Sequence, residues 1–346
     1  MKVVILASGM GTRLWPVSTK EQPKQFTFLT SKEKSMIALT YNRIKNDFSE
    51  EIFIAIRPQH AKLLKKQIPE LKDYQIVIDP KVRDTANLIV LTLDYLKRLG
   101  IKKNETIAFI PADHHINDQE GFCRSLRAAE KVVQQTKQLC LIGVEPQYPA
   151  TQFGYIERGE LQTELFYQVK SFREKPDYKT AVEYIRTGKF YWNCGIFIGN
   201  LAIFERDMQK FAPWLYEAQQ KLASFKEFNS EDYQTYYGEV EPKSIDYALI
   251  EKIDKLAVIN ASFDWMDVGS FNELFGVVEK DKNNNYNQGE NYLVDVSNSY
   301  IRNHTNKPVA VIGLDNVAVI NTNDGVLVTS LTQAQQAGQI AKKIQK

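Results

Sequence analysis

Short runs of apolar residues recur along the first half of the chain, and stretches with a helical pattern separate most of them. The runs lie at residues 3–6, 52–56, 74–78, 106–110 and 138–142. Such runs are typical of strands that are buried on both faces of a parallel sheet. The clearest helical pattern covers residues 85–99. This alternation predicts βαβ units and a doubly wound, Rossmann-like α/β fold.

The pattern becomes mixed after Tyr155. An extended run at residues 165–172, a helix around 178–187, an aromatic strand at 190–198 and further helices to about residue 252 follow one another. This succession predicts a mixed sheet and an inserted lobe that faces the substrate.

Residues 281–290 are polar and include three consecutive asparagines at 283–285, so they cannot bury enough apolar surface to form an element. We interpret them as a linker. Short strands are predicted beyond it at 300–301, 308–312, 318–321 and 326–329, followed by a helical tail from Gln333. The predicted organisation is a large domain over residues 1–280, a linker over 281–290 and a small β module with a helical tail over 291–346.

Composition narrows the classes of protein that fit. The 346 residues are 43% hydrophobic, enough for a sizeable core. The 44 lysines and arginines nearly balance 42 aspartates and glutamates and are scattered, which argues against nucleic acid or membrane partners. The first apolar run is too short for a secretion signal, and the three cysteines show no disulfide or zinc spacing. We expect a cytoplasmic protein whose partners are small molecules.

A glycine-containing loop follows the first predicted strand directly. It reads Ala7-Ser8-Gly9-Met10-Gly11-Thr12-Arg13. Its glycines let backbone N–H groups approach a phosphate without a clash from Cβ. A generic tight turn also fits this spacing, because the loop lacks the third glycine of a dinucleotide site, where Leu14 stands, and the Gly-Lys-Ser/Thr of a P-loop.

Two cationic side chains follow this loop closely, in the segments Arg13-Leu14-Trp15-Pro16-Val17-Ser18 and Pro23-Lys24-Gln25-Phe26. A bound triphosphate needs fixed positive charges of this kind. The alternative, solvated charges beside a helix start, explains poorly why such rigid motifs occur in one long non-periodic loop. The segment therefore predicts a site for a nucleoside triphosphate.

These two motifs resemble the mannose-1-phosphate guanylyltransferases, whose hallmark is a glycine-rich loop that runs into Arg-Leu-Trp-Pro-x-Ser and then Pro-Lys-Gln-Phe. The resemblance covers essentially the whole chain, because further segments resemble the family in the expected order. They are Arg83-Asp84-Thr85-Ala86, Pro111-Ala112-Asp113-His114, Phe153-Gly154-Tyr155-Ile156-Glu157, Phe172-Arg173-Glu174-Lys175-Pro176, Trp192-Asn193-Cys194-Gly195-Ile196-Phe197, Ser244-Ile245-Asp246-Tyr247 and Asp264-Trp265-Met266-Asp267-Val268-Gly269-Ser270. It implies a nucleotide-diphospho-sugar transferase fold with its catalytic domain over 1–280 and a β-helical module over 291–346.

The resemblance also implies a role for each candidate site residue. The nucleotide-binding residues are expected to be Ala7, Ser8, Gly9, Met10, Gly11, Thr12, Arg83, Asp84, Thr85 and Asp113. Catalysis is assigned to Arg13 and Lys24, and sugar 1-phosphate binding to Gly154, Glu174, Lys175 and Asn193. Taken without the resemblance, Glu174 and Lys175 also fit an exposed ion pair.

Asp113 and Asp267 are the expected metal ligands. Asp113 follows a predicted strand at the end where open α/β sheets bind ligands, and Asp267 lies in a short loop before a helix. Two carboxylates from distant segments can share a hard cation such as Mg²⁺ with the phosphates. Either aspartate alone also fits a helix cap or a turn.

Guanine recognition is expected at Arg83-Asp84-Thr85, where the Asp84 carboxylate could accept the N1–H and N2–H₂ donors of the base. The chain departs from the family pattern here, with Asp84 in place of the usual asparagine and Asn87-Leu88 in place of Pro-Ala. Ser8 likewise replaces a customary glycine. These departures leave dTTP and UTP open as alternative nucleotides.

The predicted activity is transfer of GMP from GTP to mannose 1-phosphate, giving GDP-mannose and pyrophosphate by in-line attack with the help of Mg²⁺. The alternatives are another sugar 1-phosphate, such as manno-heptose or glucose, a non-catalytic subunit that binds a sugar nucleotide, and an oxidoreductase, which Leu14 disfavours. The resemblance implies a homodimer or higher homo-oligomer. It also implies a single activity, because longer relatives carry a further phosphomannose isomerase domain.

Overall fold

The computed structural model describes residues 1–9, 11–48, 51–163 and 165–344. The chain divides into two compact units, and each unit is built from several segments. The first unit contains Met1–Ser8, Tyr41–Ala112 and Ile116–Trp265; the second contains Gly9–Thr40, Asp113–His115 and Met266–Lys346. Among the residues described, no helix is both long and apolar enough to cross a membrane.

A nine-stranded mixed sheet forms the centre of the first unit, in the order β3-β2-β1-β4-β9-β6-β10-β8-β7. The strands are β1 (Lys2–Leu6), β2 (Ile52–Ile56), β3 (Ile76–Ile78), β4 (Thr106–Pro111), β6 (Leu139–Val144), β7 (Gly154–Thr163), β8 (Phe166–Arg173), β9 (Phe190–Asn200) and β10 (Leu256–Asn260). The first four strands are parallel, and each apolar run predicted in the first half of the sequence contributes one strand. The predicted doubly wound, mixed α/β fold is confirmed.

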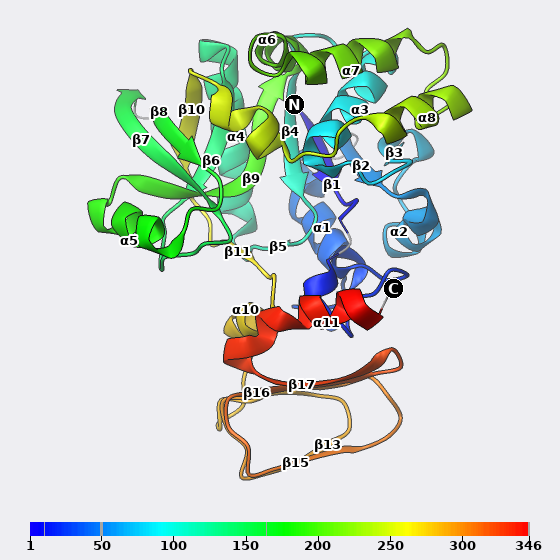
Figure 1. The fold of residues 1–346 in the computed structure, drawn as a ribbon, viewed down its shortest axis with the longest axis vertical. Helices are drawn as coiled ribbons and strands as arrows, with labels where there is room; N and C mark the ends of the chain where they lie inside the picture. Colours follow the sequence, from blue (N-terminus) through cyan, green and yellow to red (C-terminus); the bar gives the residue numbers. More distant parts are fainter. Residues whose placement is uncertain (10, 49–50, 164, 345–346) are drawn as a thin grey trace. The chain divides into compact units, whose positions relative to one another are not determined.

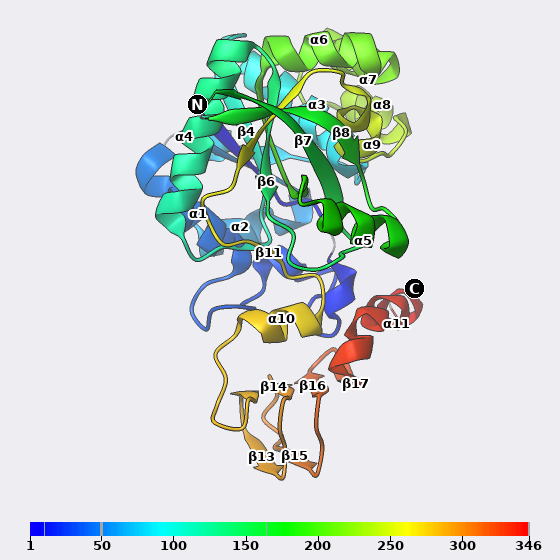
Figure 2. The ribbon, with the colours of Figure 1, turned by 90° about the vertical axis from the view of Figure 1, so that its left-hand side faces the viewer.

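Helices cover both sides of this sheet (Figure 2). Helix α4 contacts β4, β6, β9 and β10, whereas α6 contacts β9 and α7 packs on α3 and α6. The helices are α1 (Met36–Phe48), α2 (Ala61–Gln67), α3 (Asp84–Arg98), α4 (Gln119–Thr136), α5 (Tyr178–Thr187), α6 (Leu201–Phe211), α7 (Pro213–Ser224), α8 (Glu231–Glu239) and α9 (Ile245–Ala248), with 3₁₀ turns η4 (Pro58–His60), η5 (Asp73–Gln75) and η6 (Ile250–Lys252). The boundary between the two units falls within α1.

The inserted lobe predicted after Tyr155 is not a separate layer. Strand β9 pairs antiparallel with β4, β6 and β7, and β7 pairs with β8. These strands therefore extend the main sheet. The local pattern shows that a segment is extended, but it does not show which distant strand will satisfy its backbone hydrogen bonds.

The second unit contains a short β-helix (Figure 1). Strands β12 (Tyr286–Gln288), β14 (Tyr300–Asn303) and β16 (Val317–Thr322) stack in parallel, as do β13 (Asn291–Val294) and β15 (Val309–Ile312). Strand β17 (Gly325–Ser330) pairs antiparallel with β16. The other elements are η1 (Thr12–Leu14), η2 (Lys24–Phe26), β5 (His114–His115), β11 (Met266–Asp267), α10 (Phe271–Val277), η7 (Leu331–Gln336) and α11 (Ala337–Ile344).

Part of the segment expected to be a linker is ordered. Residues 286–288 form β12, and the buried Asn285 side chain donates to the Val296 carbonyl at 2.8 Å and accepts from the Ser299 N–H at 3.0 Å. This correction has a physical reason. A β-helix satisfies polar side chains by pairing them with the next coil, so an asparagine-rich segment needs little apolar burial to become an element.

One apolar core joins the start and the end of the chain within the second unit. Leu14, Trp15 and Val17 pack in the same cluster as residues of the β-helix and of the elements that follow it. Those partners include Tyr300, Ala318, Ile320, Leu327, Leu331, Ala334, Ala337 and Ala341. In terms of contacts, residues 9–40 therefore group with residues 266–346, and the domain boundaries drawn from the sequence stay a prediction.

Candidate active site

A two-stranded ribbon brings the two predicted metal ligands together. Strands β5 and β11 pair antiparallel, with Asp267 opposite His114, the residue that follows Asp113. The Lys24 ammonium lies between the two carboxylates, 2.8 Å from Asp113 Oδ2 and 2.9 Å from Asp267 Oδ1. The structure therefore joins one predicted catalytic cation to both predicted metal ligands.

Electrostatic interactions keep the Lys24 and Asp267 side chains charged. Burial lowers the pKa of the Lys24 ammonium, but Asp113 and Asp267 outweigh that effect and raise it above its usual value. Burial works to raise the pKa of Asp267, yet the charges of Lys24, His114 and Arg13 hold it well below its usual range. Lys24 and Asp267 are therefore both ionised at neutral pH.

The glycine loop packs directly against Lys24. Gly11 has φ +57°, a left-handed conformation that favours glycine, and a Cβ at this position would lie 2.5 Å from Lys24 Cβ. Gln25 Nε2 donates to the Gly9 carbonyl at 2.9 Å. The Pro-Lys-Gln-Phe motif thus fixes the loop through Gln25 and also provides the Lys24 cation.

We call Gly9, Gly11, Arg13, Lys24, Asp113 and Asp267 the phosphate cluster. Of the other predicted loop residues, Met10 and the side chain of Thr12 lie outside the described part of the structure. Ala7 and Ser8 belong to the first unit, where the Ala7 N–H donates to the Ala55 carbonyl at 2.9 Å.

The predicted sugar-phosphate residues also converge, within the first unit. A Cβ on Gly154 would overlap Glu174 Oε2 and lie 3.2 Å from Asn193 Cβ, so any larger residue would force the Glu174 carboxylate to move. Lys175 Nζ donates to Glu174 Oε1 at 2.7 Å. Lys175 has φ +48°, which is a strained conformation for a lysine and is often found at functional sites.

Asp246 completes this group, although the sequence analysis assigned it no role in the site. Asn193 Nδ2 donates to Asp246 Oδ1 at 2.9 Å, while Asn193 Oδ1 accepts the Gly195 N–H at 3.1 Å. Both ends of the Asn193 amide are therefore fixed. The signal was present in the motif Ser244-Ile245-Asp246-Tyr247, but nothing local indicated that Asp246 would lie beside Glu174. We call Gly154, Glu174, Lys175, Asn193 and Asp246 the sugar cluster.

Two acidic groups lie close together in the sugar cluster. Burial and the neighbouring Glu174 charge raise the pKa of Asp246 to about 7, against the opposing effects of Lys175 and Asn193. The second oxygen of Glu174, Oε2, is buried and makes no hydrogen bond within the described residues. An unpaired buried acceptor of this kind suits a donor from a ligand, such as a sugar hydroxyl.

The shift at Asp246 predicts a pH-dependent stability. The unfolded chain releases this proton near pH 4 and the folded protein only near pH 7, so stability should fall as pH rises between these values. We expect Asp246→Asn, which keeps the acceptor for Asn193, to remove about 2 kcal/mol of that fall. Urea unfolding of both proteins at pH 5 and pH 8 measures the difference. Equal pH dependence in the two proteins would contradict the assignment.

The predicted base-recognition segment opens helix α3. Asp84 is exposed, has φ +64° and accepts the Thr85 N–H at 2.7 Å. Aspartate and asparagine tolerate this left-handed region better than most residues. Thr85 Oγ1 accepts the Ile245 N–H at 2.9 Å, and Ile245 directly precedes Asp246 of the sugar cluster. The start of α9 is therefore tied to both predicted subsites.

Asn87, where the chain departs from the family pattern, has a structural role. Its buried amide donates to the carbonyls of Arg83 and Glu241, both at 2.7 Å, which proline could not do. We expect Asn87→Ala to lower the free energy of unfolding by about 2 kcal/mol, because two buried carbonyls lose their donor. Urea unfolding tests this, with the exposed Asn104→Ala as a control that should stay within about 0.5 kcal/mol of the wild type.

A second buried carboxyl, that of Asp79, lies near the Arg83-Asp84-Thr85 segment. Burial raises the pKa of Asp79 to about 6, although Ser8, Tyr237 and Arg57 lower it. The hydroxyls of Ser8 and Tyr237 lie close to Asp79. Within the described residues neither hydroxyl makes a hydrogen bond of good geometry, and Asp79 Oδ1 has no donor. Sequence reasoning missed Asp79, which directly follows β3 at the carboxyl end of the parallel strands, where such sheets bind ligands.

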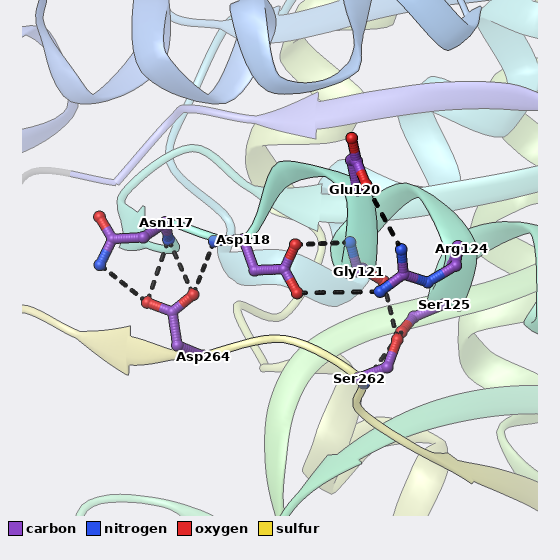
Figure 3. Close-up of polar contacts among 8 residues, drawn as sticks. All are labelled: Asn117, Asp118, Glu120, Gly121, Arg124, Ser125, Ser262 and Asp264. Carbon is purple, nitrogen blue, oxygen red and sulfur yellow. Dashed lines mark hydrogen bonds and ion pairs between the residues drawn. The ribbon is translucent and has the colours of Figure 1, made fainter.

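Asp264 is structural, although it belongs to the same motif as Asp267. Its carboxylate accepts the N–H groups of Asn117 and Asp118, at 2.9 Å and 2.7 Å, just before helix α4 (Figure 3). Asp118 in turn caps that helix by accepting the Gly121 N–H at 2.8 Å. The Asp264 side chain is thus fully occupied in holding the helix start.

A family model described as nucleotidyl transferase matches residues 2–284, and another, described as MannoseP isomerase/GMP-like beta-helix domain, matches residues 289–344. The chain belongs to the nucleotidyltransferase family. This confirms the enzyme class and the β-helical module predicted from the sequence.

Similar proteins carry a more particular description. The mannose-1-phosphate guanylyltransferase of Klebsiella pneumoniae is 33% identical, over 96% of this chain and 71% of that protein. The enzyme of the same description from Salmonella montevideo is 32% identical, over 99% of this chain and 73% of that protein. A crystal structure from Thermus thermophilus, described as mannose-1-phosphate geranyltransferase, has a TM-score of 0.89 at 26% identity and covers 100% of this chain and 99% of its own.

Proposed function

We propose that the protein transfers GMP from GTP to mannose 1-phosphate, releasing GDP-mannose and pyrophosphate. The observation that supports this most directly is the Lys24 ammonium between Asp113 and Asp267, packed against the Gly11 loop. Relatives described as mannose-1-phosphate guanylyltransferases, which match nearly the whole chain, supply the substrate class.

The phosphate cluster holds the triphosphate. Backbone N–H groups around Gly9 and Gly11 receive the β- and γ-phosphates, and Lys24 and Arg13 offset the charge that develops on the leaving pyrophosphate. The sugar phosphate oxygen attacks the α-phosphorus in line, so the protein contributes orientation and charge rather than a nucleophile. Burial raises the pKa of the Cys123 and Cys194 thiols to about 12. Both thiols are therefore protonated at neutral pH, which fits a reaction without a protein nucleophile.

The family generally uses a divalent metal ion, and we propose Mg²⁺ here. Across the described residues no group of three or more acidic, histidine or cysteine side chains converges as a metal cage. Mg²⁺ usually takes one or two carboxylates together with substrate phosphates and water, so Asp113 and Asp267 suit it. When bound, it would neutralise phosphate charge; Lys24 keeps the two carboxylates close together.

The sugar cluster holds the second substrate. Lys175 carries the charge that pairs with the sugar phosphate, and the unpaired Glu174 Oε2 accepts a sugar hydroxyl. Asn193 and the Gly154 backbone complete the contacts. The base lies at Arg83-Asp84-Thr85, where Asp79 offers a further acceptor for guanine N–H groups.

The β-helix supports the proposal of a homodimer or higher homo-oligomer. Several large apolar side chains of this module are exposed, more than half so in each case. They are Tyr292, Val294, Ile312, Val326 and Val328. Val294 and Ile312 are neighbours on paired strands, so they form one apolar surface that self-association would cover.

Pyrophosphate release with Mg²⁺ tests the proposal, measured for GTP, dTTP, UTP, ATP and CTP against mannose, glucose and heptose 1-phosphates. Release with GTP and mannose 1-phosphate alone supports it. Another active pair keeps the reaction and changes the substrate. Binding without release for every pair would favour a non-catalytic sugar-nucleotide-binding subunit.

A further inference from the structure

The last helix of the chain packs on the turn that carries Arg13. Helix α11 contacts η1, and Gly338 at its second position is buried. A Cβ built on Gly338 would lie 2.9 Å from Arg13 Cγ and 3.3 Å from Arg13 Cα. Cα belongs to the backbone, and Cγ could move away only if the Arg13 side chain changed its χ1 rotamer. Only glycine lets the helix come this close.

The other end of the Arg13 side chain lies against the loop after β11. A Cβ on Gly269 would be 3.2 Å from Arg13 Nη1 and 3.1 Å from Glu273 Oε2. Glu273 accepts the Gly269 N–H at 2.7 Å. Burial and Asp267 raise the pKa of Glu273, while Arg13 is among the groups that lower it. The guanidinium therefore lies near Gly269 and Glu273, while Arg13 as a whole is exposed.

Helix α11 does not depend on Arg13 for its own position. Ala337 and Ala341 are buried in the core cluster that also contains Leu14 and Trp15 on the Arg13 side. A small change at Gly338 should therefore displace Arg13 before it releases the helix.

We infer that Gly338 is a positioning residue for Arg13, so that the C-terminal helix helps to place a side chain of the nucleotide site. This inference rests on the catalytic role proposed for Arg13. A free arginine side chain loses roughly 2 kcal/mol of rotamer entropy when it becomes ordered. Packing the Cα–Cγ part of the side chain in advance removes part of that cost from the transition state.

The test compares Gly338→Ala and Gly338→Val with Gln339→Val, which places the same valine on the adjacent exposed position of the helix. We expect Gly338→Val to lower kcat about 10- to 100-fold and leave the KM for mannose 1-phosphate within twofold, with Gln339→Val like the wild type. Alanine is a better helix former than glycine by about 1 kcal/mol. Gly338→Ala should therefore lower kcat without lowering the unfolding temperature.

A double-mutant cycle with Arg13→Ala shows whether the effect of Gly338→Val acts through Arg13. In the Arg13→Ala background, Gly338→Val should cause no further loss of kcat and no further weakening of GTP binding. If Gly338→Val lowers kcat by the same factor in the wild type and in Arg13→Ala, the inference is overturned. It is also overturned if Arg13→Ala is slow but Gly338→Val has a normal kcat. If Arg13→Ala turns over normally, the catalytic role of Arg13 fails first, and the positioning role fails with it.

Discussion

Replacing Lys24 with alanine is expected to lower kcat by roughly 10²- to 10³-fold, the usual effect of removing one preorganised charge from a developing anion. The KM for mannose 1-phosphate should stay within about threefold of the wild type, because Lys24 belongs to the phosphate cluster and not to the sugar cluster. Steady-state kinetics of pyrophosphate release, with each substrate varied in turn, measures both quantities.

The same substitution should also destabilise the protein. It leaves the carboxylates of Asp113 and Asp267 facing each other without their shared ammonium, which costs about 3 kcal/mol. Mg²⁺ should therefore raise the unfolding temperature of Lys24→Ala more than that of the wild type, since the ion replaces the lost positive charge. The exposed Lys32→Ala is the control and should behave as the wild type. Normal turnover of folded Lys24→Ala would remove Lys24 from the mechanism.

Replacing Asp267 with asparagine should lower kcat by about 10³-fold. The variant loses one of the two carboxylates proposed for Mg²⁺, and a metal contributes several kcal/mol of charge stabilisation, where each 1.36 kcal/mol is tenfold in rate. Asparagine is nearly the same size as aspartate and Lys24 keeps its contact with Asp113, so the fold should be retained. Kinetics as a function of Mg²⁺ concentration should show a weaker apparent affinity for the ion.

The Asp264→Asn variant is a matched control for that experiment. It removes a carboxylate three positions earlier in the same motif, from a residue that accepts the N–H groups of Asn117 and Asp118 just before α4. It should lower the free energy of unfolding by about 1 kcal/mol and leave kcat within about twofold. If Asp264→Asn and Asp267→Asn lose equal activity, the effect comes from the shared loop, and the proposed metal role of Asp267 fails.

Local chemistry along the chain determined much of the fold and the enzyme class. Apolar runs fixed the strands of the parallel half of the sheet, since such runs suit an extended segment covered on both faces. The glycine loop, the Pro-Lys-Gln-Phe segment and the resemblance they carry indicated the enzyme class. Sequence reasoning could not assign pairing partners. It predicted the extended segments after Tyr155 but not their place in the main sheet, and it did not predict β12, which pairs with the next coil.

Only the tertiary structure decided how the candidate residues meet. Lys24 and Asp267 are 243 positions apart, and no periodicity along the chain predicts that an ammonium will be buried between Asp113 and Asp267. Asp246 beside Glu174, and Gly338 against the root of Arg13, are likewise visible only after folding. The sequence by itself determined which chemical groups are available and what each short segment prefers. The fold alone determined their distances, because electrostatic and packing energies depend on separation in space and not on separation along the chain.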